Sequence, residues 1–590
     1  MRLRRCRIKM AVFGFFTFAL IVWLCVHDVK MKTVQYEAGN DDRYLQWICE
    51  DNTCSKTSRS NKTTKPLLPL ETCRKICPDV VIWPEPKHFR FVSAKNHSPF
   101  LKSKLRVDVQ APPRTTEAIN KFLEIFKGYL KDNETGNDGS ILKVNIQVSD
   151  KRDDVLLNLG TDESYKLNVS KSAAITVTIV STTFFGARNG LETLSQLIWF
   201  DPYTGNHRIL HDIAIEDGPT FTYRGVMVDT SRNFFPIPLL KKIVDGMSYS
   251  KLNTLHLHLT DAVSFPMKFK NLEWLADGGA YTPTMVYTEE DIEDLMQYSL
   301  VRGVRVLLEI DAPSHVSTGW HSNPRDDNLV ICDQEDVLNG HLNPDNPGSL
   351  EVLKDVYKNL LRLMKNDDLF HIGGDEVNLD CWRDTKAAEN ETDMTVFWAG
   401  YTNLMLEKLK SANGDKLPKN IIMWSSPLTN YRYTIDELKH KDRLIVQYWF
   451  GSTNGILGQN LRIIYSTVGH WYLDCGFGPW KPSQKNGVCD PFTSWQKFYE
   501  YKPWENEFVK NLTEGGEVCL WAEQVAEESL ETRIWPRAAA FAERVWSDPV
   551  RVEGDVYMRL DNFREILRFR DLEVSAIWPK WCTMNPGRCK

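Results

Sequence analysis

The sequence predicts an α/β protein. A (β/α)8 TIM barrel follows an α+β domain and a small disulfide-rich N-terminal segment. Its 590 residues exceed one ordinary domain, so several are expected. From Phe221 onward, strand-like apolar runs alternate with amphipathic helical patterns, and polar or aromatic residues follow the successive runs. Alternating β and α units argue for a parallel barrel, whose active site lies at the carboxyl ends of its strands.

The N-terminus predicts a membrane signal anchor. Residues 1–9 form a basic tail, and residues 10–26 form an apolar run at the short end of the range for a membrane span. The basic flank should stay cytoplasmic, which gives a type II membrane protein of the Golgi or plasma membrane with a lumenal or extracellular catalytic part. No small-x-small cleavage site follows the run, but cleavage, which would give a secreted protein, is the alternative.

Thirteen cysteines and several sequons indicate an oxidising secretory compartment. Residues 27–78 form a stem and a cysteine-rich cap, in which a zinc site is the alternative to disulfides. The disulfide candidates are Cys49, Cys54, Cys73 and Cys77 in the cap, the local pairs Cys475 with Cys489 and Cys582 with Cys589, and Cys332 with Cys381 between two loops. The glycosylation candidates are Asn61, Asn133, Asn168, Asn390 and Asn511; the sequon at Asn96 is doubtful because Pro99 follows it.

The pattern of residues 79–221 predicts the α+β domain. Residues 142–149 and 174–180 alternate like strands, and residues 185–199 have the apolar spacing of a helix. The domain shows no evident catalytic cluster.

Residues 222–590 contain the barrel pattern. We expect strands at 225–229, 254–259, 305–310, 369–372, 421–424, 444–449 and 518–521, and helices at 239–249, 289–302 and 350–364. The residues expected at the strand ends are Asp229 to Arg232, His258 to Asp261, Glu309 to Asp311 with His315, Asp375 and Glu376, Trp424, Trp449, Tyr472 with Asp474, and Trp521 with Glu523.

A series of strand ends that carry carboxylates, arginine, histidine and aromatic side chains predicts a sugar-binding site. A lone histidine or tryptophan at a strand end is more often structural, but a whole series is harder to dismiss. Carboxylates and arginine bind hydroxyl groups, and tryptophan faces stack on the C–H surfaces of a sugar. No cluster has convincing metal-ligand spacing, and the net charge of -6 gives no argument for nucleic acid.

The run Gly373-Gly374-Asp375-Glu376 is the most suggestive of these strand ends. The glycines let backbone or ligand approach closely. Two adjacent carboxylates cannot share one environment, so their pKa values should be pushed apart. A solvated acidic turn is the plainer alternative for this segment taken alone.

The order of the motifs resembles glycoside hydrolase family 20, the β-N-acetylhexosaminidases, from about Val80 to the C-terminus. The segments that carry the resemblance are residues 224–232, 256–261, 309–315, 371–377 and 521–524. The cysteine-rich N-terminus and residues 581–589 resemble the arthropod branch.

The resemblance implies retaining exo-hydrolysis of a terminal GlcNAc, with GalNAc left open. The nucleophile would be the acetamide oxygen of the substrate, and the intermediate an oxazolinium ion. Glu376 would be the general acid and then the base, with a raised pKa in the free enzyme. Asp375 would orient the acetamide and stabilise the intermediate. Tyr472 would donate a hydrogen bond to the acetamide oxygen.

The resemblance also implies how the sugar is held. Trp424, Trp449 and Trp521 would wall the sugar, and Arg232 would bind its C3 and C4 hydroxyls. Asp474 and Glu523 would bind the C4 and C6 hydroxyls. Asp261 and His315 would support the catalytic pair. No cofactor or metal is implied, and whether the chain forms a homodimer stays open.

The sequence departs from the arthropod pattern at one position that affects the expected substrate. Arthropod members that digest chitin oligomers usually carry a tryptophan where Val488 stands, and residues 321–340 contain no tryptophan. This favours N-glycan trimming, as in the branch resembling fused lobes. Chitooligosaccharide or broad-specificity hydrolysis is the alternative. An inactive membrane-anchored sugar-binding protein is a second alternative, which the presence of Glu376 and Tyr472 disfavours.

Overall fold

The structure is a computed structural model that describes residues 45–57, 65–132, 134–136, 139–326, 328–333, 340–487, 489–550, 555–586 and 588–589. The expected basic tail, the signal anchor, most of the stem, Asn61, Asn133 and Val488 lie outside these ranges. Within the described ranges, the helices are all too short or too polar to cross a membrane.

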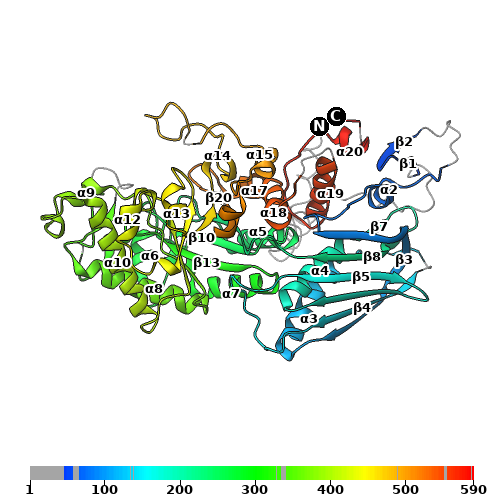
Figure 1. The fold of residues 1–590 in the computed structure, drawn as a ribbon, viewed down its shortest axis with the longest axis horizontal. Helices are drawn as coiled ribbons and strands as arrows, with labels where there is room; N and C mark the ends of the chain where they lie inside the picture. Colours follow the sequence, from blue (N-terminus) through cyan, green and yellow to red (C-terminus); the bar gives the residue numbers. More distant parts are fainter. Residues whose placement is uncertain are drawn as a thin grey trace, which may run out of the picture.

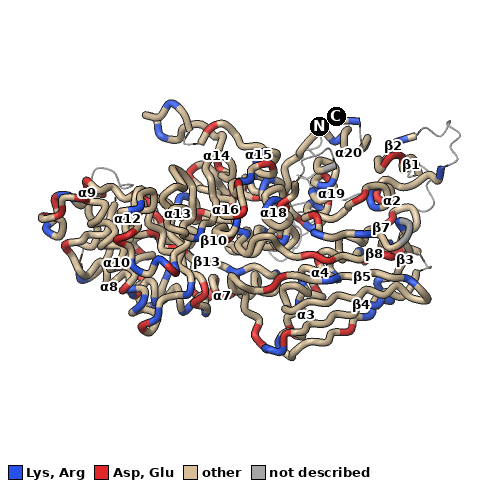
Figure 2. Tube along the Cα trace, in the orientation of Figure 1, with Lys and Arg blue, Asp and Glu red and all other residues tan. Residues whose placement is uncertain are grey.

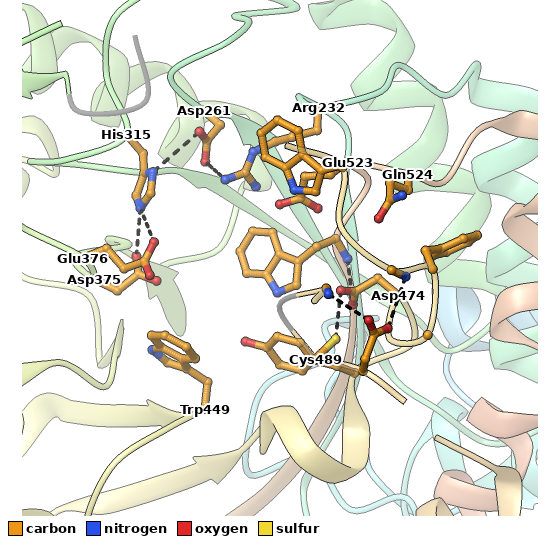
Figure 3. Close-up of a pocket in the computed structure, with 18 of the residues that line it drawn as sticks. Arg232, Asp261, His315, Asp375, Glu376, Trp449, Asp474, Cys489, Glu523 and Gln524 are labelled. Carbon is orange, nitrogen blue, oxygen red and sulfur yellow. Dashed lines mark hydrogen bonds and ion pairs between the residues drawn. The ribbon is translucent and has the colours of Figure 1, made fainter. Parts of the chain in front are cut away.

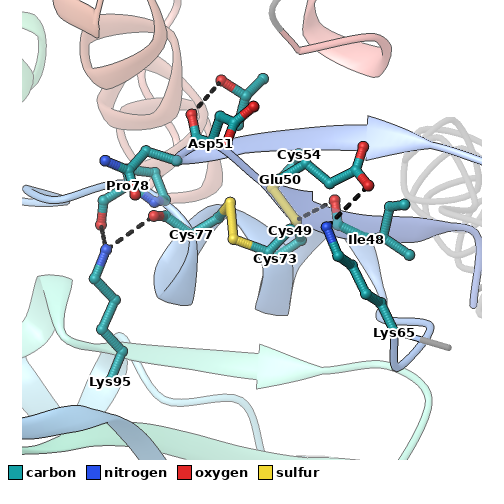
Figure 4. The surroundings of a disulfide bond; sticks show 12 residues. Ile48, Cys49, Glu50, Asp51, Cys54, Lys65, Cys73, Cys77, Pro78 and Lys95 are labelled. Carbon is teal, nitrogen blue, oxygen red and sulfur yellow. Dashed lines mark hydrogen bonds and ion pairs between the residues drawn. A yellow bond between two sulfur atoms is a disulfide. The ribbon is translucent and has the colours of Figure 1, made fainter.

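A small cap precedes the two large parts of the molecule. Strands β1 (Trp47–Glu50) and β2 (Thr53–Lys56) form an antiparallel pair beside helix α2 (Leu70–Ile76). Disulfides Cys49–Cys77 and Cys54–Cys73 tie the helix to the strands (Figure 4). So small a unit buries few apolar side chains, so covalent bonds replace a core. These four cysteines are bonded to one another rather than arranged around a zinc ion.

The second part is a six-stranded sheet in the order β3-β4-β6-β5-β8-β7. Its strands are β3 (His88–Gln110), β4 (Ser140–Val148), β5 (Tyr165–Lys171), β6 (Ile175–Ser181), β7 (Ile198–Asp201) and β8 (Asn206–Asp217). Alternate residues of β5 are buried and exposed, so only one face packs on a core. Helices α3 (Pro113–Gly128) and α4 (Phe184–Gln196) pack beside the sheet (Figure 1), and α3 also contacts the barrel helix α7 (Glu289–Val301). The helix expected at 185–199 ends earlier, because Ile198 and Trp199 pair with β8.

The third part is the barrel, an eight-stranded parallel sheet in the order β13-β10-β9-β20-β19-β18-β17-β16. The strands are β9 (Tyr223–Asp229), β10 (Thr254–Thr260), β13 (Arg305–Ile310), β16 (Leu369–His371), β17 (Asn420–Trp424), β18 (Leu444–Tyr448), β19 (Arg462–Tyr465) and β20 (Thr513–Leu520). The predicted fold class is confirmed. Among the described residues, β13 and β16 form no ladder with each other, so the barrel is nearly closed.

The helices around the barrel are unequal in length. The longer ones are α5 (Ile237–Tyr249), α7 (Glu289–Val301), α8 (Pro347–Met364), α10 (Met394–Ala412), α18 (Arg537–Ser547) and α19 (Asp555–Phe569). The shorter ones are α6 (Glu273–Gly279), α9 (Leu379–Arg383), α11 (Pro427–Asn430), α12 (Arg432–Asp436), α13 (Asn454–Gly458), α14 (Val468–Trp471), α15 (Trp495–Glu500), α16 (Glu507–Leu512), α17 (Glu527–Ile534) and α20 (Lys580–Met584). Two-residue strands β11 (Met267–Lys268), β12 (Tyr287–Thr288), β14 (Val330–Ile331) and β15 (His341–Leu342) lie in the connections. The loops after β17 and β18 therefore carry only short helices.

A buried ion pair joins the α+β domain to the barrel. The Arg224 guanidinium, at the amino end of β9, lies 2.6 Å from the carboxylate of Glu163 and is fully buried. The side-chain amide of Asn253 donates a second hydrogen bond to Glu163, and the Arg224 guanidinium lies 4.9 Å from the Trp546 ring. Breaking such a pair would leave a buried charge without a partner, which costs several kcal/mol, about 3–5. Basic and acidic residues are otherwise interspersed along the chain (Figure 2).

Candidate active site

The loops after the barrel strands enclose a pocket of about 820 Å³, open mouth included. Figure 3 shows the side chains that converge on it. Of the predicted catalytic and binding residues, all but Trp424 line it: Arg232, Asp261, His315, Asp375, Glu376, Trp449, Tyr472, Asp474, Trp521 and Glu523. The lining also includes residues outside the predicted set: Asp311, Gly476, Phe477, Gly478, Trp480, Gly487, Cys489, Asp490 and Gln524.

The two glycines after β16 are required by the turn that presents the carboxylates. Gly373 and Gly374 have φ of +71° and +94°, which favours glycine. A Cβ atom at Gly373 would lie 1.8 Å from Oδ1 of Asp311, and that same oxygen accepts the Gly374 N–H at 2.8 Å. Glu376 also has a positive φ of +48°. A non-glycine residue in this conformation is uncommon and is stabilised by its surroundings.

This turn gives the adjacent carboxylates different surroundings. Asp375 is 7% exposed, whereas the Glu376 side chain is 58% exposed. His315 lies between the two, with its Nε2 at 3.4 Å from Glu376 and 4.0 Å from Asp375 (Figure 3). One carboxylate is therefore set in the pocket floor and the other stands at its open side.

His315 belongs to a chain of alternating charges. Its Nδ1 lies 3.6 Å from Asp261, and the Arg232 guanidinium lies 2.7 Å from the same carboxylate. Burial alone would raise the pKa of Asp261, but Arg232 and His315 hold that pKa well below its usual value. Burial opposes the charged form of His315 too, yet Asp261 raises the pKa of His315 well above its ordinary value. This shift favours the imidazolium form of His315.

The charge on His315 corrects one expectation. A raised pKa was expected for Glu376 in the free enzyme, but the hydrogen bond from His315 lowers it despite partial burial. The group with the raised pKa is Asp375, at about 6, because it is buried and lies near the negative charges of Glu376 and Glu309. The pKa values of Asp375 and Glu376 thus differ, as predicted, but the raised one belongs to Asp375 rather than to Glu376. The reason is that Glu376 has a cationic partner and is open to solvent.

Asp311 was named in the sequence only as part of a motif, but it supports the site directly. Burial and the neighbouring Asp375 raise the pKa of Asp311 well above its usual value, which favours its neutral form. A neutral Asp311 can hold the Gly374 amide without adding a further negative charge beside Asp375. The sequence signal for this role was the acidic residue one position beyond an apolar strand.

Aromatic side chains and a second acidic pair form the rest of the pocket. Tyr472 is buried, and the Trp521 ring lies 5.1 Å from the Arg232 guanidinium. The indole N–H of Trp449 donates to a backbone carbonyl at 2.8 Å, which fixes that ring. Burial and the nearby Glu523 raise the pKa of Asp474 to about 8. This shift favours the neutral form of the Asp474 carboxyl at pH 7.

Two expected positions differ from the structure. Trp424 does not line the pocket: it is fully buried, donates its indole N–H to Glu309 at 2.7 Å, and lies behind Trp521 at a ring distance of 5.8 Å. Tyr472 does not directly follow a strand, because α14 separates it from β19. A bridge between Tyr472 and Cys519 of β20 places the tyrosine at the pocket.

A buried polar cluster fills the barrel beneath the pocket. Glu309 lies 2.8 Å from His258 and 3.0 Å from both His256 and His371. His258 in turn lies 3.1 Å from Asp261, which connects the cluster to the pocket. His256, Glu309 and His371 bring their ligand atoms within 4.8 Å of one another. However, the Glu309 carboxylate is already occupied by three imidazoles and the Trp424 indole, so the cluster fits a hydrogen-bond network better than a metal ion.

The remaining predicted sites lie at the surface or in the connecting loops. Disulfides Cys332–Cys381, Cys475–Cys489 and Cys582–Cys589 are present, and Cys519 is a buried free thiol. The glycosylation candidates Asn168, Asn390 and Asn511 are exposed. Asn96 is exposed as well, but the hydroxyl of its sequon, Ser98, is buried 3.0 Å from His211.

The comparisons with known proteins all indicate the same family. Residues 221–549 match the glycosyl hydrolase family 20 catalytic domain, and residues 40–197 match a domain described as beta-acetyl hexosaminidase like. The chain is 34% identical to a Drosophila melanogaster protein named probable beta-hexosaminidase fdl, over 92% of this chain and 90% of the relative. It is also 34% identical to a chitooligosaccharidolytic beta-N-acetylglucosaminidase of Bombyx mori, over 94% and 96%.

Solved structures agree on the fold. The exo beta-N-acetylglucosaminidase of Vibrio harveyi, solved with N-acetylglucosamine, superposes with a TM-score of 0.66 at 21% identity, over 90% of this chain and 85% of that one. Together with the pocket of carboxylates and tryptophans, these matches show that the chain belongs to glycosyl hydrolase family 20 and is a β-hexosaminidase-type glycoside hydrolase.

Proposed function

We propose that the protein is a retaining exo-β-N-acetylhexosaminidase that removes a terminal non-reducing GlcNAc by substrate-assisted catalysis. The observation that carries this proposal is the divided carboxylate pair, with Asp375 in the pocket floor and Glu376 at its open side. A floor carboxylate can meet the acetamide of a bound sugar, and an open-side carboxyl can meet the glycosidic oxygen. GalNAc fits the same scheme.

The first step needs a proton on Glu376. In the free enzyme His315 carries the proton that the pair shares, because the pKa of His315 is raised and that of Glu376 is lowered. A bound glycan removes water from Glu376, and loss of water favours its neutral form. The 3.4 Å contact with His315 can then supply the proton without bulk solvent.

The bond changes follow from that arrangement. The acetamide oxygen attacks C1, the glycosidic C–O bond breaks, and the leaving oxygen takes the proton from Glu376. Ionised Asp375 stabilises the positive charge of the oxazolinium ion, and Tyr472 positions the acetamide oxygen. Water then attacks C1 and gives a proton to Glu376 while the C1–O bond of the oxazolinium ring breaks. The two successive inversions at C1 retain the anomeric configuration. Arg232, Asp474 and Glu523 bind ring hydroxyls, and Trp449 and Trp521 wall the sugar.

Replacing the proposed acid, Glu376, should lower kcat by an amount that depends on the leaving group of the substrate. We expect Glu376→Gln to lower kcat on a GlcNAc disaccharide by about 10²–10⁴-fold, because the variant cannot protonate the leaving oxygen. A GlcNAc glycoside of an acidic phenol has a leaving oxygen that needs no protonation, so kcat on this substrate should fall much less. Steady-state kinetics on both substrates test this, with product anomers followed by NMR. Equal losses on both would contradict the acid role of Glu376, and a folded wild type with no hydrolysis would favour the inactive sugar-binding alternative.

We expect the pH dependence of kcat/KM to reflect the ionisation of Asp375 and of His315. Since Asp375 must be ionised and its pKa is about 6, kcat/KM should rise about tenfold per pH unit up to about pH 6 and then level off. It should fall again where His315 loses its proton, at a pH above the ordinary 6.5 of a histidine. Asp375→Asn should remove the acidic limb and lower the plateau. A wild-type acidic limb centred below pH 4.5 would contradict this assignment.

We further propose that the physiological substrate is a GlcNAc-terminated N-glycan. The support is Val488 in place of a tryptophan and the absence of tryptophan from residues 321–340. The two insect relatives have equal identity, so they do not separate N-glycan trimming from chitooligosaccharide hydrolysis. We expect kcat/KM on a biantennary GlcNAc-terminated N-glycan to exceed that on chitobiose. The reverse ranking would favour chitooligosaccharide or broad-specificity hydrolysis.

The proposed location is the secretory pathway, with residues 10–26 as a type II anchor. The basic residues before this run and the five disulfides among the described residues support it. We expect the full chain to stay in the membrane pellet after alkaline carbonate extraction, while a chain lacking residues 1–26 does not. Recovery of the full-length product in the medium with a new N-terminus after residue 26 would instead indicate a cleaved signal.

A further inference from the structure

Arg537, the first residue of α18, is a buried arginine that lies outside the pocket lining. It is 3% exposed, and its four hydrogen bonds among the described residues all run to backbone carbonyl oxygens. A charge that is taken out of water is stable only when its donors are satisfied, and carbonyl oxygens satisfy them here. Such a guanidinium ties segments of backbone to one another.

The guanidinium of Arg537 joins three segments that are distant in the sequence. Its Nη2 donates to the carbonyl of Leu473 at 2.5 Å, and its Nη1 donates to the carbonyl of Thr493 at 3.2 Å. Nη2 and Nε both donate to the carbonyl of Arg533, in the last turn of α17, at 2.8 and 3.2 Å. A planar fork of donors can reach several directions at once, which a lysine ammonium on a flexible stem does less well.

Leu473 connects this fork to the pocket. It stands between Tyr472 and Asp474, both of which line the pocket. Its backbone N–H donates to the carbonyl of Cys519 in β20 at 2.7 Å, while its own carbonyl accepts from Arg537. Because both backbone polar groups of Leu473 are held, β20 and α18 together fix the segment from which the Tyr472 and Asp474 side chains project.

The contact with Thr493 anchors the other end of the same loop. Disulfide Cys475–Cys489 closes the loop that follows Asp474, and buried Thr493 lies just beyond it. The Arg537 guanidinium also lies 4.5 Å from the ring of Phe492. One side chain therefore holds the chain where it enters this part of the pocket wall and where it leaves.

We infer that Arg537 is a positioning residue for the proposed reaction. It touches no substrate, but it holds the backbone that places Tyr472 at the acetamide and Asp474 at the ring hydroxyls. This inference rests on the proposed function and extends it to a residue outside the pocket. A displacement of about 1 Å in that backbone would misplace both groups, and errors of this size can slow a reaction by about 10²-fold.

The test compares two buried arginines of α18. Arg537→Met removes every donor and keeps a long side chain. Arg544→Met is the matched control, because Arg544 is 2% exposed and donates to the carbonyls of Tyr499 and Pro549, which do not line the pocket. The measurements are KM and kcat on a GlcNAc glycoside, the inhibition constant of a thiazoline analogue of the oxazoline intermediate, and Tm.

The inhibition constant and KM distinguish positioning from mere stability. Loss of folded protein lowers the apparent kcat but leaves both of these constants unchanged. We expect Arg537→Met to raise the thiazoline inhibition constant at least about tenfold, which corresponds to about 1.4 kcal/mol, and to raise KM while it lowers kcat. Arg544→Met should lower Tm, because it leaves buried carbonyls without donors, and should leave the inhibition constant and KM unchanged.

Arg537→Lys gives a second measurement if the methionine variant does not fold. The lysine keeps the charge but not the fork, so we expect the inhibition constant to rise at least about threefold. A wild-type inhibition constant and KM in the folded Arg537 variants would overturn the inference, as would an equal rise in Arg544→Met. If the thiazoline fails to inhibit the wild-type protein, the proposed function fails rather than the role of Arg537.

Discussion

The barrel interior is organised around one buried carboxylate, Glu309. Burial opposes its charge, yet three neighbouring imidazoles hold its pKa well below the usual value. A charge in so dry an interior is stable only when partners from all sides reach it. Those partners come from β10, β16 and β17, so the interaction sets how these strands face one another. Through His258 and Asp261 the same network reaches His315, so the orientation of His315 depends on groups deep in the barrel.

The pocket chemistry follows from the turn after β16. Close approach of Asp311 excludes any side chain at Gly373, and the turn that results sends Asp375 inward and Glu376 outward. Two residues adjacent in sequence thereby acquire opposite electrostatic surroundings. One is buried beside like charges, and the other is solvated beside an imidazolium. The difference between the surroundings of Asp375 and Glu376 therefore follows from the backbone conformation of this turn.

Much of the fold was predictable because parallel strands alternate with helices and the strand ends carry polar groups. The short strand β19 was missed, since Arg462–Tyr465 is brief and the helices after it blur the pattern. The pKa order of Asp375 and Glu376 could not be predicted, because it depends on where His315 lies in space. The buried place of Trp424 was also beyond the sequence: a tryptophan at a strand end looks the same whether it faces a ligand or Glu309.

One covalent bond crosses the gap in the barrel. Strands β13 and β16 share no ladder, but Cys332 and Cys381, in the connections that follow them, are bonded to each other. These same connections carry His315 and Glu376. The hydrogen bonds of the sheet do not link the loops of His315 and Glu376 directly, but the disulfide does. Thiol oxidation therefore adds a link between the loops of His315 and Glu376 that the hydrogen bonds of the sheet do not supply.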